Sequence, residues 1–78
     1  MHFSNVFNKF LFSNAIIKRD RFQYQLVEIN DGHYNKKIVL ITAFLNDNRT
    51  EKFWQDYNEA LFTIDDIQAS NWEIVASN

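Results

Sequence analysis

Apolar residues near the start of the chain recur with the spacing of an amphipathic helix. Positions i, i+3, i+4, i+7 and i+8 are large and apolar, and polar residues separate them. These positions are Phe3, Val6, Phe7, Phe10 and Leu11. The pattern predicts a helix with one apolar face. Asn14 follows where we expect the helix to end, because Asn tolerates the left-handed conformation of a C-terminal cap.

A short extended run follows the predicted helix and ends in a cluster of cations. Ala15 precedes two β-branched residues, Ile16 and Ile17, which favour a strand. Three cations and an aromatic ring close this run, at Lys18, Arg19, Arg21 and Phe22. We therefore expect the helix to turn back onto a first strand whose end carries these four side chains.

A second strand and a hairpin turn come next. Residues 23–29 have strand character, and the change of phase between Leu26 and Val27 indicates either a bulge or burial on both faces. Residues 30–33 read Asn-Asp-Gly-His, and an Asp-Gly pair is typical of a hairpin.

Residues 38–45 form an almost continuous apolar run, in which only Thr42 is polar. A strand that is apolar on both faces is normally central and covered on both sides. One short helix covers only one face of a small sheet. The run therefore predicts that a second copy of the chain covers the other face, as a homo-oligomer.

Residues 51–62 fit two patterns, after a polar turn at residues 46–49. One pattern is a helix, and the other is a strand that alternates over residues 53–57. Periodicity alone slightly favours the helix. The helical stripe would consist of Phe53, Trp54, Tyr57 and Leu61, with Thr50 as the N-cap.

The chain closes with a second helix signal and a last strand. Thr63 and Asp66 are spaced as a capping box, with Asp in place of Glu, which predicts a short helical turn through Ala69. The pattern of residues 72–75 predicts a last short strand. We expect Trp72, which lies between small and apolar residues, to be part of the core.

Size and composition restrict the class of protein. The 78 residues allow one domain, 1–78, and the absence of cysteine excludes disulfides and thiolate metal sites. Aromatic residues make up 17 %, which indicates a bulky core or exposed stacking surfaces. The net charge of −2 argues against general nucleic-acid binding. No targeting or membrane-spanning segment is visible, so we expect a cytoplasmic protein without membrane association.

The order of these motifs resembles a family of small phage proteins. The first motif is the N-terminal helix with its strand ending in Lys-Arg-Asp-Arg-Phe, and the second is the strand at residues 41–45. The third is residues 66–75, where an acidic helical turn runs through Ala69 and Trp72 into a strand. Together they resemble the phage-borne Thoeris anti-defence sponges of the second described type. The chain departs from that pattern by having Phe22 for Trp, Asn71 for Asp and Asn14 for Gly, and by a shorter segment between the second and third strands.

The resemblance implies both a fold and a function. The fold is α+β, with an N-terminal helix packed on a small antiparallel β-sheet and a short helical turn before the last strand. It implies a strand rather than a helix at residues 51–57, and assembly as dimers or tetramers. The implied function is to bind a cyclic ADP-ribose-type or cyclic nucleotide immune signal without cleaving it.

Several residues are candidates for contact with such a ligand. Arg19 would bind phosphate, since arginine makes bidentate charge-assisted hydrogen bonds, and Phe22 would stack on a base. Each has a structural alternative, because Arg19 has acidic neighbours and Phe22 suits an ordinary core. Trp54, Ser70 and Asn71 are the remaining candidates, the last two through bonds to a ribose or base edge.

Catalysis and metal binding have little support. His2 lies at the N-terminus and His33 in a turn, and no serine has a predictable base beside it. The pair Asp65 and Asp66 is better explained by helix capping than by acid–base chemistry. Metal-ligand spacing is absent, and we expect no cofactor. The alternative function is a protein-binding inhibitor of a host defence nuclease, of the anti-CRISPR or anti-restriction kind, acting through an acidic surface.

Overall fold

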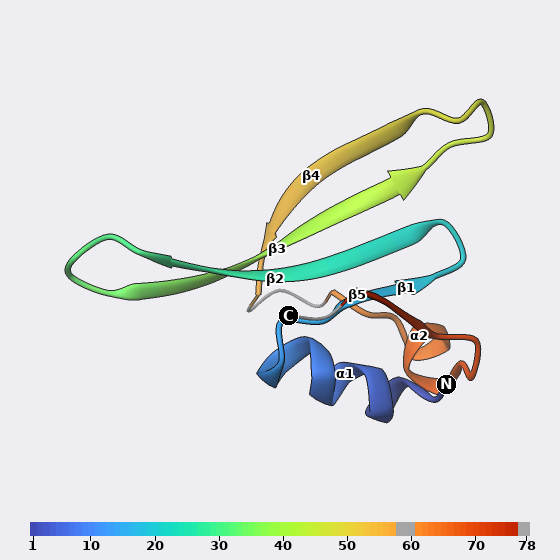
Figure 1. The fold of residues 1–78 in the computed structure, drawn as a ribbon, viewed down its shortest axis with the longest axis horizontal. Coiled ribbons are helices and arrows are strands. Elements are labelled where there is room, and N and C mark those ends of the chain that lie inside the picture. The colour runs from blue at the N-terminus through green and yellow to red at the C-terminus, as the bar shows by residue number, and fades with distance from the viewer. Residues whose placement is uncertain (58–60, 77–78) are drawn as a thin grey trace.

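The computed structural model describes residues 1–57 and 61–76 as an N-terminal helix packed on an antiparallel sheet (Figure 1). The elements are α1 (Phe3–Phe12), β1 (Ile16–Arg19), β2 (Phe22–Asn30), β3 (Asn35–Phe44), β4 (Thr50–Asp56), α2 (Ile64–Gln68) and β5 (Glu73–Ala76). The strands form one antiparallel sheet in the order β4-β3-β2-β1-β5. The α+β fold predicted from the sequence is thus confirmed. No helix among these residues is long and apolar enough to cross a membrane.

α1 begins and ends where the apolar spacing predicts. Phe3, Val6 and Phe10 are buried beneath it, as the amphipathic pattern requires. The amide of Ser13 closes the last turn, and Asn14 follows with a φ of 52°. Asn14 therefore makes the left-handed step that turns the chain back toward β1.

Two residues, Asp20 and Arg21, connect β1 to β2 in a tight turn. Asp20 has a φ of 55°, a conformation that Asp tolerates better than most residues. Phe22 is the first residue of β2, which corrects the prediction that it belongs to the end of the first strand. Phe22 pairs with Arg19 across the turn and with Ala43 of β3 on its other side. Arg19 and Phe22 still share one face of the sheet, because directly opposed residues do so.

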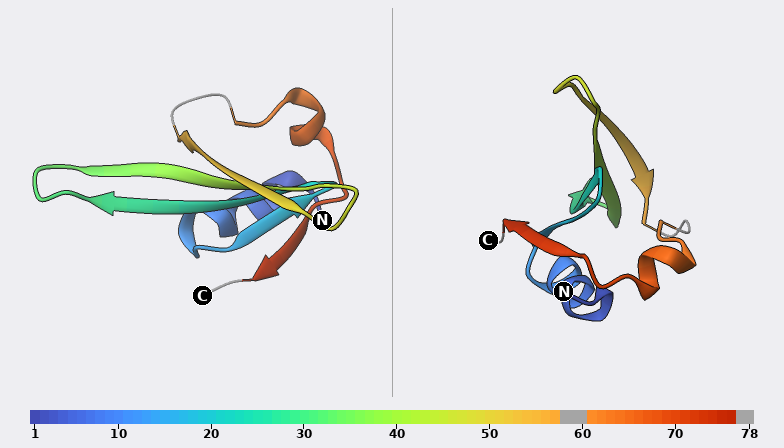
Figure 2. Two further views of the ribbon diagram at one scale, coloured as in Figure 1. Left: turned by 90° about the horizontal axis from the view of Figure 1, so that it is seen from above. Right: turned by 90° about the vertical axis from the view of Figure 1, so that its right-hand side faces the viewer.

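β2 and β3 form a long hairpin that projects from the body of the molecule (Figures 1 and 2). Their register is unbroken, so the change of phase is no bulge: Leu26 is buried on the face that α1 covers, and Val27 is partly exposed on the opposite face. The turn follows the Asp-Gly prediction. Gly32 has a φ of 90°, and its amide donates to the side chain of Asn30 at 3.0 Å.

β4 is a strand, which confirms the assignment implied by the resemblance and not the slightly favoured helical stripe. It pairs with β3 over its whole length, from Asp56 opposite Ile38 to Thr50 opposite Phe44. Thr50 is therefore the first residue of a strand and no helix cap. This pairing satisfies one edge of β3, which a helix would have left open.

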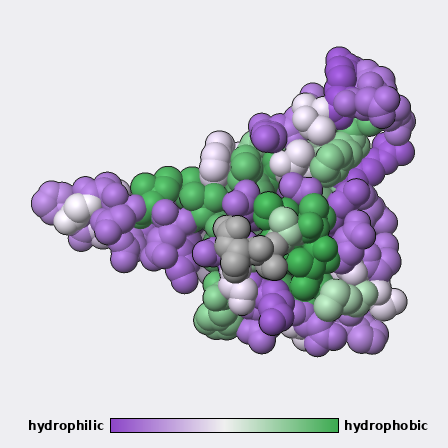
Figure 3. Space-filling view, viewed as in Figure 1, coloured by the Kyte–Doolittle hydropathy of each residue, from purple (hydrophilic) through white to green (hydrophobic). Residues whose placement is uncertain are grey.

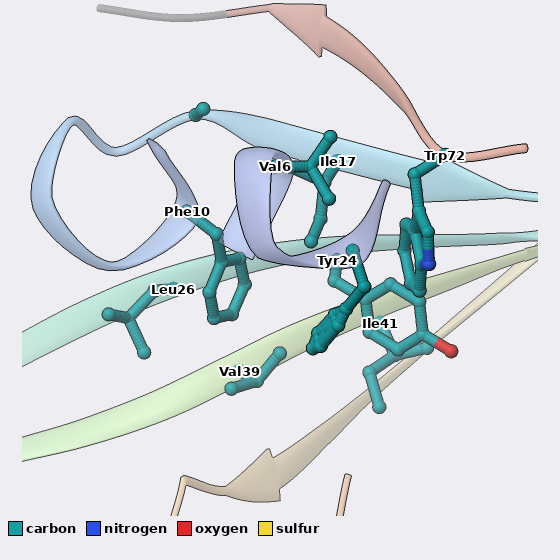
Figure 4. Packing of buried hydrophobic residues seen from close by; sticks show 10 residues of the cluster. Val6, Phe10, Ile17, Tyr24, Leu26, Val39, Ile41 and Trp72 are labelled. Atoms are coloured by element: carbon teal, nitrogen blue, oxygen red, sulfur yellow. The ribbon is translucent and has the colours of Figure 1, made fainter. Parts of the chain in front are cut away.

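The core lies between α1 and one face of the sheet. Figure 4 shows helix residues meeting strand residues from β1, β2 and β3, with Trp72 closing one end. The buried side chains shown there include Val6, Phe10, Ile17, Tyr24, Leu26, Val39 and Ile41. α1 covers this face together with Trp72 and the partly buried Leu61, Phe62 and Ala69 of the closing segment.

α2 is held by the capping box that the sequence predicts. The hydroxyl of Thr63 accepts from the Asp66 amide at 3.1 Å, and the Asp66 carboxylate accepts from the Thr63 amide at 3.0 Å. Trp72 is 2 % exposed, and its indole N–H donates to the Asp66 carbonyl at 2.8 Å. Trp72 is therefore core, as expected.

The opposite face of the sheet carries apolar side chains with no cover in the described chain. α1 and α2 both lie on the other side (Figure 2). On this outer face Ile38 and Leu40 are partly exposed, and Trp54 is 56 % exposed. Hydrophobic residues also show at the surface where the hairpin leaves the body, whereas its tip is hydrophilic (Figure 3). β3 is therefore apolar on both faces, and assembly with a second copy stays a prediction.

Candidate functional site

A hollow of about 840 Å³ opens beside the core, between the sheet and the segment that leads into α2. Its floor is formed by side chains of β2, β3 and β4, and Thr63 and Asp66 line the facing wall. The turn between β1 and β2 forms one end. The hollow is on the same side of the sheet as α1, because Tyr24 and Ile41 belong both to its lining and to the core.

Aromatic rings line the hollow on two strands. Phe22 and Phe53 are each 43 % exposed, although both are large apolar side chains. Phe22 lies at the start of β2, and Phe53 on β4 is opposite Ile41 of β3. Two half-exposed rings over an apolar floor offer stacking surfaces to a planar ligand.

Arg19 is bound by the protein itself. Its Nη1 donates to Asp66 Oδ1 at 2.6 Å, and its Nε donates to Asn71 Oδ1 at 2.9 Å. Its Nη2 is 3.8 Å from Asp20 Oδ2, and Asn71 Nδ2 donates to Asp20 Oδ1 at 3.0 Å. Arg19 thus links β1, α2 and the segment before β5. Two carboxylates neutralise its charge.

Arg21 is the second cation that lines the hollow, and the protein engages its guanidinium less than it engages that of Arg19. It is exposed in the turn between β1 and β2, and it forms no ion pair with any residue that the structure describes. Its backbone is fixed, since its carbonyl accepts from the Phe44 amide at 2.8 Å. The sequence analysis favoured Arg19 over Arg21 as the ligand contact. The acidic neighbours Asp20 and Asp66 were the signal that could have reversed this choice.

Tyr24 contributes a hydroxyl that stays protonated in the hollow. Burial, and to a smaller extent the negative charge of Asp66, raise the pKa of Tyr24 to about 12, against the lowering effect of Arg19. A neutral phenol can donate a hydrogen bond to an anionic or carbonyl oxygen. The sequence analysis places residue 24 in the second predicted strand, residues 23–29, and gives it no role in a site.

The structure brings some of the predicted ligand residues together and separates others. Arg19 and Phe22 line the hollow, and Asn71 lies against Arg19 without lining it. Ser70 is exposed, and its backbone carbonyl accepts from the amino group of Met1 at 3.0 Å. Trp54 lies on the outer face, where it lines a separate depression of about 330 Å³. Trp54 therefore does not share a site with Arg19 and Phe22.

The groups around the hollow suit binding better than bond cleavage. Among the residues described, no cluster of His, Asp and Glu could hold a metal ion. Neither histidine lines the hollow, and the hydroxyl of Thr63 is engaged in capping α2. Asp66, the carboxylate of the facing wall, is engaged by Arg19 and by the Thr63 amide.

Among the described residues, the hollow thus combines aromatic walls, the Arg21 side chain without an ion pair at one end, and a protonated phenol in its floor. Comparison of the chain with protein-family models, with curated proteins and with solved structures found no match.

Proposed function

We propose that this protein binds and sequesters a small nucleotide immune signal, of the cyclic ADP-ribose or cyclic nucleotide type, without cleaving it. The observation that carries the proposal is the pairing of Phe22 and Phe53 with Arg21 around one hollow of about 840 Å³. Ligand sites of about 300–1,000 Å³ are typical for small molecules. The resemblance to the phage sponges supports the same function, in the cytoplasm of a host cell.

The base of such a ligand would stack on Phe22 or Phe53. Both rings are half exposed although they border the core, which is where a purine could replace water on an aromatic face. Stacking of a base on an aromatic side chain contributes about 1–3 kcal/mol. The apolar floor beside Ile41 favours a ring system over a sugar at this position.

The phosphates would be held at the end of the hollow by Arg21. A charge-assisted hydrogen bond from a guanidinium to a phosphate contributes about 1.5–3 kcal/mol. Arg19 would contribute by holding Asp66 in place. Asn71 would then act on the ligand only through Arg19, and Ser70 would not contact it.

Turnover requires a nucleophile or a general base placed at the ligand. Among the described residues that line the hollow, the Asp20 carboxylate lies 3.8 Å from Arg19 and accepts from Asn71 at 3.0 Å. The Asp66 carboxylate already accepts from Arg19 and Thr63. Tyr24 remains protonated up to a pH near its raised pKa of about 12. The ligand should therefore be released chemically intact.

The test is to incubate the protein with cyclic ADP-ribose and a panel of cyclic nucleotides, and to measure binding by native mass spectrometry. After removal of unbound ligand, the protein is denatured and the released compound is analysed. Intact ligand in stoichiometric amount is the expected result. A cleaved product would make the protein an enzyme. No bound nucleotide would favour the alternative of a protein inhibitor that acts through an acidic surface.

Two matched pairs of variants locate the site. Arg21→Ala should weaken binding by about one to two orders of magnitude. Arg49→Ala should not, because Arg49 lies in the β3–β4 turn, paired with Asp47 and away from the lining residues. Phe22→Ala should weaken binding, whereas Phe12→Ala, which removes an 81 % exposed ring on α1, should not. Equal effects within either pair would contradict the proposed site.

A further inference from the structure

β4 has one edge paired with β3 and one open edge, with which no other described strand pairs. On the paired edge, the Tyr57 amide donates to the Lys37 carbonyl at 3.2 Å. The Leu45 amide donates to the Arg49 carbonyl at 2.9 Å in the same ladder. Bonded pairs recur at every second residue of an antiparallel ladder, so the odd-numbered residues of β4 bond to β3. The residues whose amides and carbonyls face outward are Thr50, Lys52, Trp54 and Asp56.

This open edge is a template for another strand. β4 is the last strand of the sheet on this side, and none of the backbone bonds within the described ranges reaches its outward groups. An exposed edge of this length invites pairing unless charge or shape prevents it. Lys52 is such a charge, and a partner strand that offers an anion opposite Lys52 would neutralise it.

We propose that the open edge of β4 pairs antiparallel with β4 of a second copy of this chain, about a two-fold axis at Trp54. Lys52 then lies opposite Asp56 of the partner subunit, and Asp56 opposite Lys52 of the partner subunit. The two Trp54 side chains meet on the outer face of a continuous sheet. The strand thus supplies the anion that its own lysine requires.

Charge complementarity favours this register over the other registers with two-fold symmetry. An axis at Lys52 would place two lysines directly opposite each other, which is destabilising. An axis at Phe53 would place Lys52 opposite a tryptophan and leave its charge unmatched. Only the axis at Trp54 creates two ion pairs. Asp56 also binds Lys36 of its own chain at 3.0 Å, and its side chain is 49 % exposed, so its carboxylate has room for a second donor.

The pairing also joins the two candidate sites. Phe53 and Gln55 line the 840 Å³ hollow from the face opposite to Trp54. With the axis at Trp54, Phe53 lies opposite Gln55 of the partner subunit, on the same face. The two hollows therefore adjoin along the seam, and each gains a side chain from the other copy.

Single cysteines test the register, because the chain contains no cysteine of its own. Directly opposed residues of a bonded antiparallel pair have Cα atoms about 5.5 Å apart, within the range of roughly 4.4–6.8 Å that a disulfide spans. Trp54→Cys should therefore form a disulfide-linked dimer on mild oxidation. Lys52→Cys should not, since four residues of strand, about 13 Å, would separate the two sulfurs.

Cross-linking and sedimentation distinguish a wrong register from a wrong interface. Circular dichroism first confirms that both cysteine variants are folded. Preferential cross-linking of Lys52→Cys would overturn the register. A wild-type protein that sediments as a 9.4 kDa particle at micromolar concentration would overturn the interface itself. Both results concern assembly alone and leave nucleotide binding to be judged separately.

A charge swap provides a second test that needs no covalent bond. Lys52→Asp should raise the dissociation constant of the dimer by at least about tenfold, because it opposes Asp56 of the partner subunit. Adding Asp56→Lys should restore much of the affinity by reversing both ion pairs. Lys37→Asp, the same charge change on an exposed residue of β3, is the matched control and should leave assembly unchanged. No recovery in the double variant would overturn the proposed pairing.

Discussion

Asp66 joins α2 to β1, and its replacement by Ala should remove two contacts at once. Its Oδ1 accepts from Arg19 Nη1 at 2.6 Å, and its Oδ2 accepts from the Thr63 amide at 3.0 Å. The side chains of Arg19 and Asp66 are only 22 % and 16 % exposed. Solvent therefore screens this ion pair less than it screens a surface pair.

The expected cost of Asp66→Ala follows from these contacts. Loss of a helix N-cap interaction costs about 1 kcal/mol, and loss of a charge-assisted hydrogen bond costs about 1.5–3 kcal/mol. The variant should thus lower the free energy of unfolding by about 2–4 kcal/mol. Domains of this size have a total of roughly 4–12 kcal/mol. The melting temperature should fall by about 8 °C or more, at roughly 4–8 °C per kcal/mol.

Urea unfolding followed by the fluorescence of Trp72 measures this cost, in a Trp54→Phe background that leaves one indole. Asp65→Ala is the matched control, because Asp65 is the exposed neighbour in the same turn. Thr63→Ala should cost about 1 kcal/mol, since it removes only a cap. The reasoning would be refuted if Asp66→Ala and Asp65→Ala unfolded at the same urea concentration.

Three further perturbations have expected outcomes. Phe10→Ala should cost about 3–5 kcal/mol in urea unfolding, because Phe10 is fully buried, whereas Phe12→Ala on the exposed side of α1 should cost little. Stability should fall as the pH rises from 10 to about 12, because the raised pKa of Tyr24 stabilises the fold only while its phenol is protonated. Tyr24→Phe should flatten this dependence in alkaline titrations of unfolding and Tyr34→Phe should not. Gly32→Ala should lower stability by about 1–2 kcal/mol, because Gly32 has a φ of 90°, and a melting curve identical to the parent's would contradict this.

Local chemistry made much of the fold predictable. The helix, its end at Asn14, the Asp-Gly hairpin and the capping box of Thr63 all depend on residues close in sequence. The sequence left β4 ambiguous between strand and helix, because the adjacent residues Phe53 and Trp54 are both apolar although they lie on opposite faces of an edge strand. The pairing of β4 with β3 decides between strand and helix, and this pairing is not apparent from the periodicity of the sequence.

The candidate site was less predictable, because it depends on which charges meet across the fold. The sequence places Arg19 and Arg21 two residues apart, and only the structure shows that Asp66 and Asn71 engage the first. Likewise, β4 could present either of two adjacent aromatic rings to the hollow. The register with β3 turns Phe53 inward and Trp54 outward.

The pairing of β5 with β1 has a consequence for how the molecule opens. β2, β3 and β4 are joined by short turns, whereas Ile74 reaches Ile17 only after the whole meander has formed between them. Closing such a long loop costs more chain entropy than closing a hairpin. The segment from residue 61 to residue 76 should therefore dock last and detach first, as a sub-global unit whose amides exchange before those of β3. That segment carries Thr63 and Asp66. A ligand that touches both walls of the hollow would therefore stabilise the docked state of this segment against local unfolding.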